Sequence, residues 1–390
     1  MITLAIVFGL YNPADTVMKE TTIDEVVVSS FANPGSKAVR KGRLASIDEH
    51  IRALNKVDVV RRGSYAWEPV VNGMQTERLS TTIDGMKIFY ACTDRMDPVT
   101  SYVESGNLQR ISLDGGLDGN PQATGNIGGS IDLKLRKVGF SAQPSEYNLS
   151  AGYESNGNLF VTGADAAFSS SRFYSNFGAY YRGAGNYRAG GEEVEYSQFH
   201  KFNAFVNVGF QPRLDHIIEG TVIFDRAFDV GYPALTMDVK DATGFITSLS
   251  FRRENIGSIL NRWETKAYYN HILHNMDDTT RPDVVIHMDM PGRSKTAGLY
   301  SLLEGTLGDN RYQLNYDVYY NTLFADMTMY VSGAKPMYML TWPDVHTFNT
   351  GFSFTDDLAL GEHHNLRLSA KLSWQHRHIC NDEGFKALAI

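Results

Sequence analysis

The sequence predicts a small α+β domain followed by the strands of an antiparallel transmembrane β-barrel. Three observations support this prediction: an aromatic-rich composition, a change of hydrophobic pattern near Val138, and long alternating segments after that point. Among 390 residues, Tyr and Phe number 21 each and Gly 35, while Pro numbers only 12. Such a profile favours many aromatic-rich strands and argues against disorder.

Residues 1–22 contain an apolar run of about nine residues in the sequence MITLAIVFGLYNPADTV. This length matches the core of an export signal and is too short for a membrane-spanning helix. The basic region that precedes such a core is missing, because the first positive residue is Lys19. Two interpretations stay open: a signal remnant followed by flexible chain, or a buried first strand. No apolar run of 18 or more residues follows, so helical membrane spans are not expected.

Residues 23–138 are predicted to form the small α+β domain. The segment SIDEHIRALNKV is its one convincing helix, because Ser46 and Glu49 have the spacing of a capping box and an apolar stripe follows. The domain ends in GNIGGSIDLKLRKV, where glycines precede an alternating strand around Leu133. We therefore expect a mixed core of one helix and several short strands.

Residues 139–390 are predicted to be barrel strands. About 11 long alternating strands lie between Glu146 and Arg377, with turn signals such as Asn156-Gly157 between them. Strands that cross a membrane need about 9–11 residues, whereas soluble strands average about five or six. Apolar residues on one parity and polar residues on the other describe a wall with lipid on one side. Short turns alternate with longer polar loops, and in such barrels the short turns face the periplasm.

Charge and motif content exclude several classes of protein. The net charge is −8 and no basic stripe is present, so nucleic acid is not an expected partner. Two cysteines, Cys92 and Cys380, are too few and too far apart in sequence for a disulfide framework. The sequence contains no GxSxG, HExxH, P-loop or paired CxxC motif, so we expect a binding or transport protein and not an enzyme.

Soft donor atoms gather at two places in the sequence. The segment YACTDRMDP contains Cys92 and Met96, and the strand KAYYNHILHNMDD contains His274 and Met276. A thiolate, two thioethers and an imidazole suit Cu(I) and tolerate Cu(II), whereas a site for hard cations would show clustered carboxylates. Taken alone, each residue is better explained as a buried hydrophobe or as a hydrogen-bonding histidine.

Further methionines lie in segments that read as polar loops, where packing has little use for them. They are Met237 and the three MxM pairs Met288/Met290, Met327/Met329 and Met337/Met339. The pairs are candidate accessory sites that capture Cu(I) before the main site does. The alternative is that they pack a lid or line a flexible binding surface, and it is favoured by the absence of a spacing rule that ties the pairs together. No role is assigned to the other histidines, among them His271, His287, His363, His364, His376 and His378.

The order of four motifs resembles the plug domain and first strands of TonB-dependent outer-membrane receptors. The motifs are TIDEVVVSS, VVRRGSYAWEPVVNGMQTERLSTTIDGMKI, SGNLQRISLDGG and GNIGGSIDLKL, followed by long strands. The resemblance covers nearly the whole chain. It implies a monomeric receptor in the outer membrane of a Gram-negative cell, with a plug inside a barrel of about 22 strands. This chain has room for about half of them, so we expect the full protein to be longer, because an open half-barrel would leave unpaired edges in lipid.

The resemblance also implies a partner protein. In the family, a short apolar segment near the amino end is the TonB box, which adds a strand to TonB, the protein that an inner-membrane complex energises. Here the corresponding residues are Asp24, Glu25, Val26, Val27 and Val28. Taken alone, this run would instead be an edge strand of the plug.

Finally, the resemblance implies a cargo. A CxxxM pattern on the plug and an HxM pattern on the barrel resemble the subgroup that imports copper, so Cys92, Met96, His274 and Met276 are expected to hold a copper ion between plug and wall. One rival keeps the fold but carries siderophore iron, haem or cobalamin.

A larger cargo of that kind needs an aromatic or Arg-lined pocket, to which Tyr65, Trp67 and Trp342 would contribute. The other rival is a surface binding protein that transports nothing.

Overall fold

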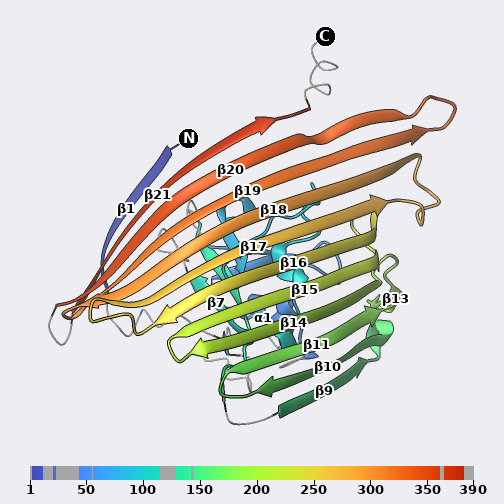
Figure 1. Cartoon of the computed structure of the whole chain (residues 1–390). Coiled ribbons are helices and arrows are strands. Elements are labelled where there is room, and N and C mark those ends of the chain that lie inside the picture. The colour runs from blue at the N-terminus through green and yellow to red at the C-terminus, as the bar shows by residue number, and fades with distance from the viewer. Residues whose placement is uncertain are drawn as a thin grey trace.

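The structure is a computed structural model of the whole chain, and it describes residues 2–11, 21–22, 44–54, 56–114, 128–141, 145–360 and 364–381. Most of these residues lie in antiparallel strands (Figure 1). Among them no helix is long and apolar enough to cross a membrane. The expectation of a mostly antiparallel β protein is therefore confirmed, although the helical share is smaller than an α+β domain suggests. The predicted TonB box, Asp24 to Val28, lies outside the described residues.

A curved sheet of 12 strands, called the large sheet below, dominates the molecule (Figure 1). Neighbouring strands are antiparallel and follow chain order from β9 to β21, with β1 added beyond β21. The bounds are β1 (Ile2–Tyr11), β9 (Ser145–Glu154), β10 (Leu159–Ser169), β11 (Phe173–Ala184), β14 (Phe199–Arg213), β15 (His216–Val230), β16 (Asp238–Glu254), β17 (Leu260–Asp277), β18 (Ile286–Leu307), β19 (Asn310–Val331), β20 (Met337–Ala359) and β21 (Asn365–Ile379). Eleven of these 12 described strands lie between residues 145 and 379, which agrees with the number expected from the sequence.

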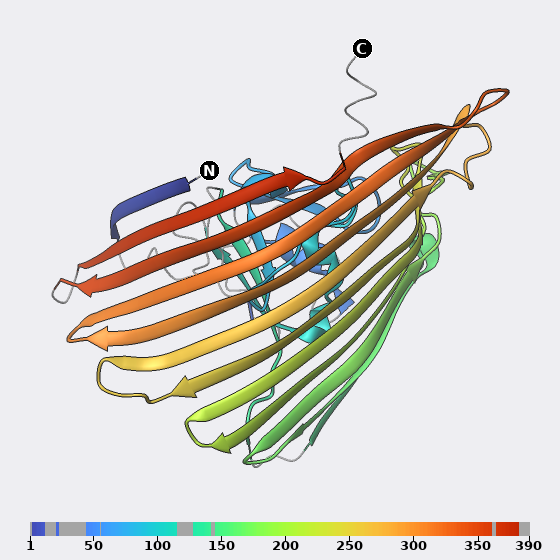
Figure 2. The same ribbon diagram turned by 45° about the horizontal axis from the view of Figure 1, so that its top comes forward.

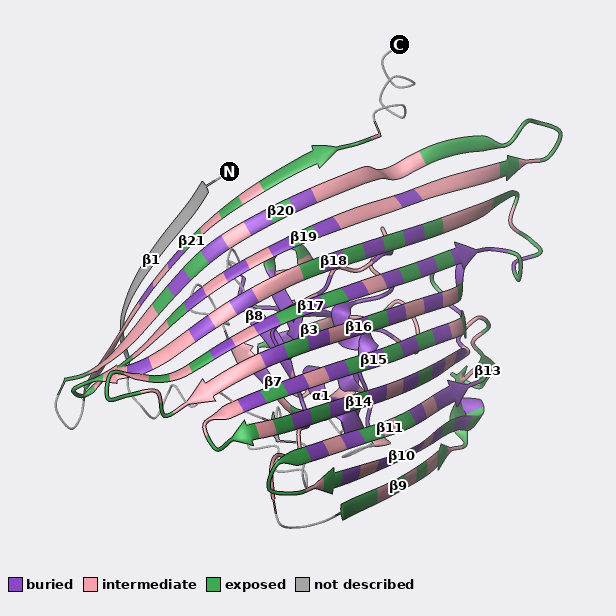
Figure 3. Ribbon diagram, viewed as in Figure 1, coloured by how far each residue is buried: buried purple, intermediate pink, exposed green. Residues whose placement is uncertain are grey.

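Buried and exposed residues alternate along the long strands (Figure 3). On β14, Lys201 and Asn203 are buried on the inner face, whereas Phe202 and Val206 are exposed on the outer face. A sheet with a polar inner face and an apolar outer face is the reverse of a soluble sandwich and matches the wall of a membrane barrel.

The connections at the two ends of the large sheet differ in length. One end carries two-residue turns at 214–215 and 308–309. The other end carries the longer connections 185–198, 231–237, 278–285 and 332–336, the first of which contains the hairpin β12 (Arg188–Ala189) and β13 (Glu192–Glu193). We call this second end the long-loop end. The asymmetry agrees with the sequence expectation.

The apolar run at the amino terminus forms strand β1 at the edge of the large sheet. It pairs with β21 from Ile2 opposite Trp374 to Tyr11 opposite Asn365. This placement follows the first-strand interpretation for residues 2–11, whereas a flexible segment in residues 12–20 stays a prediction. The physical reason is that β21 would otherwise present a row of unpaired backbone N–H and C=O groups. An export signal in this run stays a prediction.

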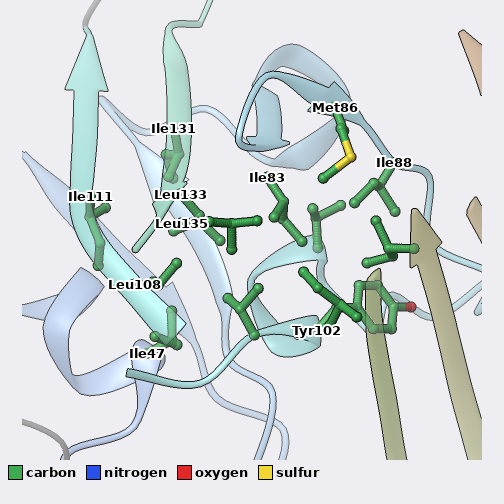
Figure 4. Packing of buried hydrophobic residues seen from close by; sticks show 14 of the residues in the cluster. Ile47, Ile83, Met86, Ile88, Tyr102, Leu108, Ile111, Ile131, Leu133 and Leu135 are labelled. Atoms are coloured by element: carbon green, nitrogen blue, oxygen red, sulfur yellow. The ribbon is translucent and has the colours of Figure 1, made fainter. Parts of the chain in front are cut away.

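The small domain comprises the described residues 44–138 and the short strand at Thr21–Thr22. Its central sheet has the strand order β2-β7-β8-β5-β6, and β3 and β4 form a separate hairpin. The bounds are β2 (Thr21–Thr22), α1 (Ile47–Arg52), β3 (Val57–Val60), β4 (Glu68–Val71), β5 (Ser80–Ile83), β6 (Met86–Lys87), β7 (Leu108–Asp114) and β8 (Ser130–Leu135). Figure 4 shows its apolar core, in which Ile83, Ile111, Ile131 and Leu133 are fully buried.

The helix α1 starts as the sequence predicts and ends early. The Ser46 hydroxyl accepts from the Glu49 backbone N–H at 3.3 Å, and the Ser46 N–H donates to the Glu49 carboxylate at 2.8 Å, which completes the capping box. The predicted helix ran to Val57. It stops at Arg52 because Lys56 takes a left-handed backbone conformation with φ 66° and Val57 opens strand β3.

The small domain lies against the concave face of the large sheet (Figure 2). Buried ion pairs join the two. The Glu104 carboxylate forms ion pairs with Arg182 of β11 at 2.7 Å and with Lys201 of β14 at 2.9 Å. The Asp84 carboxylate forms an ion pair with Lys266 of β17 at 2.6 Å. All five side chains are at least nine-tenths buried. Because removing one partner would strand a buried charge, these pairs fix the position of the small domain in the sheet.

Candidate functional site

A tight loop of the small domain carries Cys92 and Met96. The Asp97 carboxylate accepts hydrogen bonds from the backbone N–H groups of Ala91 at 2.8 Å and Cys92 at 3.1 Å, and from the Tyr102 hydroxyl at 2.8 Å. Three donors converging on one buried carboxylate close the loop around it. The loop therefore presents both sulfur side chains at fixed positions, and each is buried.

The facing half of the site comes from strand β17. His274 and Met276 are two residues apart, so their side chains leave the strand on the same face. Both are buried, at 1% and 4% exposure, which places them on the inner face of the large sheet. The register sets Val239 of β16 and Met290 of β18 opposite Met276.

The loop and the strand bring the four predicted residues together. The Cys92 Sγ lies 3.6 Å from the Met276 Sδ, although the two residues are 184 positions apart. The ligand atoms of Cys92, His274 and Asp97 lie within 4.8 Å of one another. Met96 and His274 line one small cavity. The arrangement is a compact set of soft and borderline donors, of the type that binds copper ions.

A glycine on strand β18 of the large sheet allows the loop that carries Cys92 to approach the sheet this closely. A Cβ atom on Gly292 of β18 would lie 2.0 Å from the Ala91 carbonyl oxygen. Gly292 is also the register partner of His274. Glycine at position 292 therefore allows the loop that carries Cys92 to pack against β18, beside His274 of the neighbouring strand.

We expect Gly292→Ala to weaken copper binding by about tenfold or more, because the Ala91 backbone must move and carry Cys92 with it. A competitive titration of copper against a chelator of known affinity measures the change. Gly257→Ala is the matched control, since a Cβ at Gly257 meets nothing within 4 Å. Equal affinity in the two variants would show that the close approach has no part in the site.

Two loops of the long-loop end cover the site. The Tyr232 hydroxyl donates to the Met96 carbonyl oxygen at 3.2 Å, and Tyr232 is almost fully buried. The Arg281 guanidinium donates to the carbonyl oxygens of Tyr232 at 3.0 Å and Leu235 at 2.8 Å, and it pairs with Asp238. The connections 231–237 and 278–285 are thus tied together above Cys92 and Met96.

The electrostatics of the loop favour a protonated thiol. Burial raises the pKa of the Cys92 thiol well above its ordinary value, and the Asp97 carboxylate raises it further. An incoming metal ion must therefore displace a proton before the thiolate can bind it.

The MxM pairs lie on strands, which corrects the expectation that they sit in polar loops. Their register partners are Met290 opposite Met276, Met288 opposite Met329, Met329 opposite Met337, and Met327 opposite Met339. Residues that face each other across strands share one face of the sheet, so the pairs form a continuous methionine row that ends at the site. These segments were expected to be loops because strands β18 to β20 continue beyond the part of the sequence in which apolar and polar residues alternate regularly. Met237 lies in the connection 231–237 and packs with Cys92.

Sequence reasoning missed Asp97, Tyr232 and Arg281. Asp97 directly follows Met96 and precedes a proline, a turn signal that would have marked it as a loop-closing residue. Tyr232 and Arg281 had no sequence signal, because they act through contacts between distant loops.

The aromatic residues considered for a larger cargo do not form one pocket. Tyr65 and Trp67 line a cavity of about 860 Å³ together with Arg61, Arg182 and Lys201. Trp342 lies apart from them, with its ring 5.9 Å from that of Tyr90.

Comparison with known proteins places the fold. No family model and no curated sequence matches the chain. Among solved structures, the copper transporter OprC matches with a TM-score of 0.79 and 23% identity over 86% of this chain and 53% of its own. The chain has the fold of TonB-dependent outer-membrane receptors. It spans about half the length of that structure.

Iron transporters share this receptor fold. The FrpB iron transporter from Neisseria meningitidis matches with a TM-score of 0.62 and 14% identity over 86% of this chain and 60% of its own. The ferric citrate transporter FecA matches with a TM-score of 0.62 and 13% identity over 96% of this chain and 57% of its own. The neighbours are transporters and receptors, which fits the expectation of a non-enzyme.

Proposed function

We propose that the protein imports copper across the outer membrane, and that Cys92, Met96, His274 and Met276 hold the ion on its way. In this proposal the small domain is the plug and the large sheet is part of the barrel wall. The observation that carries it is the contact between the Cys92 Sγ and the Met276 Sδ, with His274 beside them. Sulfur and imidazole donors without a free carboxylate suit copper better than hard cations. The Asp97 carboxylate, which lies among these donor atoms, already accepts three hydrogen bonds within the loop.

Each half of the proposed site belongs to a different body. Cys92 and Met96 move with the plug, whereas His274 and Met276 are fixed in the wall. Copper enters from the long-loop end, where the methionine row supplies accessory soft donors. TonB then pulls on the segment around Asp24 to Val28. Displacement of the plug separates the two pairs of ligands, so the movement that opens a path also breaks the copper site and frees the ion.

The cargo is tested by growth of a strain that lacks the gene. We expect poor growth on limiting copper that the intact gene restores and that the Met276→Ala form does not, with growth on limiting iron unchanged. Siderophore, haem or cobalamin transport is the runner-up, because Tyr65, Arg61 and Lys201 line a polar cavity. A defect confined to iron limitation would overturn the copper proposal in its favour.

Copper affinity should rise with pH. Since burial raises the pKa of the Cys92 thiol, the thiol stays protonated through the neutral range, and each bound ion releases one proton. We expect the apparent affinity to increase about tenfold per unit between about pH 7 and pH 8.5. This range lies above the ordinary imidazole pKa of about 6.5, so the thiol dominates the slope.

The measurement is a set of copper titrations at fixed pH, compared with the same set on Cys92→Ser. A flat profile in the wild-type protein would exclude thiolate coordination.

A further inference from the structure

A second group of metal-binding side chains lies on the opposite face of the wall. The ligand atoms of His346, His378 and Cys380 all lie within 4.8 Å of one another. His346 of β20 is the direct register partner of His378 of β21, and Cys380 follows two residues later on the same face. Three donors from two strands thus meet at one point.

The group points away from the small domain. Thr347 is buried on the inner face and its register partner is Arg377, so by alternation the adjacent residues His346 and His378 face outward. Phe348 and Trp374, an outward aromatic pair with centroids 5.8 Å apart, lie next to the group. The group therefore lies on the outer face of the large sheet, beside exposed aromatic residues.

The individual distances fit a shared ion. The Cys380 Sγ lies 3.2 Å from the His378 Nε2, and the His346 Nε2 lies 3.3 Å from an Asp344 carboxylate oxygen. With bonds of about 2.0–2.3 Å in a tetrahedral site, neighbouring ligand atoms are about 3.3–3.7 Å apart. Small side-chain rotations are enough to bring these atoms around one ion.

The surroundings hold the donors in place. The Cys380 N–H donates to the Asp344 carbonyl oxygen at 3.0 Å, which ties the end of β21 to β20. The Tyr320 hydroxyl contacts the His346 Nδ1. Metal-binding histidines usually keep such a partner on the second ring nitrogen, which orients the ring.

We propose that His346, His378 and Cys380 form a second metal site, for a borderline divalent ion such as Zn²⁺ or Cu²⁺. Two imidazoles and one thiolate are borderline donors, in contrast to the thioether-rich inner site. Asp344 or water completes the coordination. The site is exposed and lies outside the path between plug and wall, so it binds its ion independently of copper import.

Zinc binding to the Cys92→Ser protein in detergent tests this proposal, because that background removes the inner thiolate. We expect one Zn²⁺ per chain and a loss of affinity of about tenfold or more in Cys380→Ser and in His378→Ala. The matched control is His364→Ala, since His364 is exposed directly before the start of β21 and is not part of the group.

Alkylation of Cys380 gives a second readout that does not depend on affinity. We expect Zn²⁺ to slow the reaction of this exposed thiol, a chelator to restore it, and His378→Ala to remove the protection. Unchanged zinc affinity in Cys380→Ser, or an equal loss in His364→Ala, would overturn the proposal. Copper titration of Cys380→Ser in the wild-type background reads the inner site separately, so failure of one site is distinguishable from failure of the other.

Discussion

Replacing Cys92 by serine lowers copper affinity by about a hundredfold or more, which corresponds to about 2.7 kcal/mol. The serine hydroxyl is a hard donor that does not ionise near neutral pH, so the ion loses its only anionic ligand. His274→Ala should have an effect of similar size, because it removes the only imidazole of the set. Equilibrium titration against a chelator of known affinity, at fixed pH and with Cu(I) kept reduced, measures both.

The chain supplies its own control for this experiment. Cys380→Ser removes the other thiol, which is exposed on the outer face, and it should leave high-affinity copper binding unchanged. Because Cys92 is buried and Cys380 is exposed, thermal unfolding of both variants is measured as well, which distinguishes a loss of folding in Cys92→Ser from a loss of copper ligation. Unaltered affinity in both Cys92→Ser and His274→Ala would refute the proposed site.

The second large effect concerns energy coupling. Val26→Pro should abolish copper uptake by cells while leaving copper binding to the purified protein intact. Proline removes a backbone N–H and so prevents the segment Asp24 to Val28 from adding a strand to TonB. Uptake of labelled copper into cells and equilibrium binding are measured on the same variant.

Val26→Thr is the matched control, because threonine keeps the backbone donor and a branched side chain, and it should retain uptake. Full uptake by Val26→Pro would contradict coupling through this segment. Absence of energised uptake in the unmodified protein would instead favour a surface binding protein.

The strands of the large sheet were predictable because their signal is local. Alternation on β14 and its neighbours depends only on residues two positions apart. About 11 long strands were expected, and 11 described strands of the large sheet lie between residues 145 and 379. Local chemistry also set the start of α1 at Ser46. Its end was not predictable, because the left-handed turn at Lys56 depends on the packing of the hairpin that follows.

The candidate site divides in the same way. Cys92, Met96, His274 and Met276 were predicted from motif spacing and from resemblance. The structure brings Cys92 into contact with Met276 and close to His274, with Met96 in the same buried cluster. The methionine row escaped notice because it exists only in the register between β18, β19 and β20. The closure of the loop by Asp97 and the cover provided by Tyr232 are likewise products of tertiary contact.

The ion pairs between Glu104 or Asp84 and the large sheet have a mechanical consequence. A domain held only by apolar contacts would expose apolar surface whenever it moved. That surface would favour association with any other exposed apolar surface. Ion pairs behave differently. When the two charged groups separate, water solvates each of them, so the net free-energy cost of separation is small compared with their Coulomb attraction. The charged part of the contact can therefore separate without exposing apolar surface, whereas Phe205, Ile246 and Ile272 of the large sheet pack beside it in the apolar core of the inner domain.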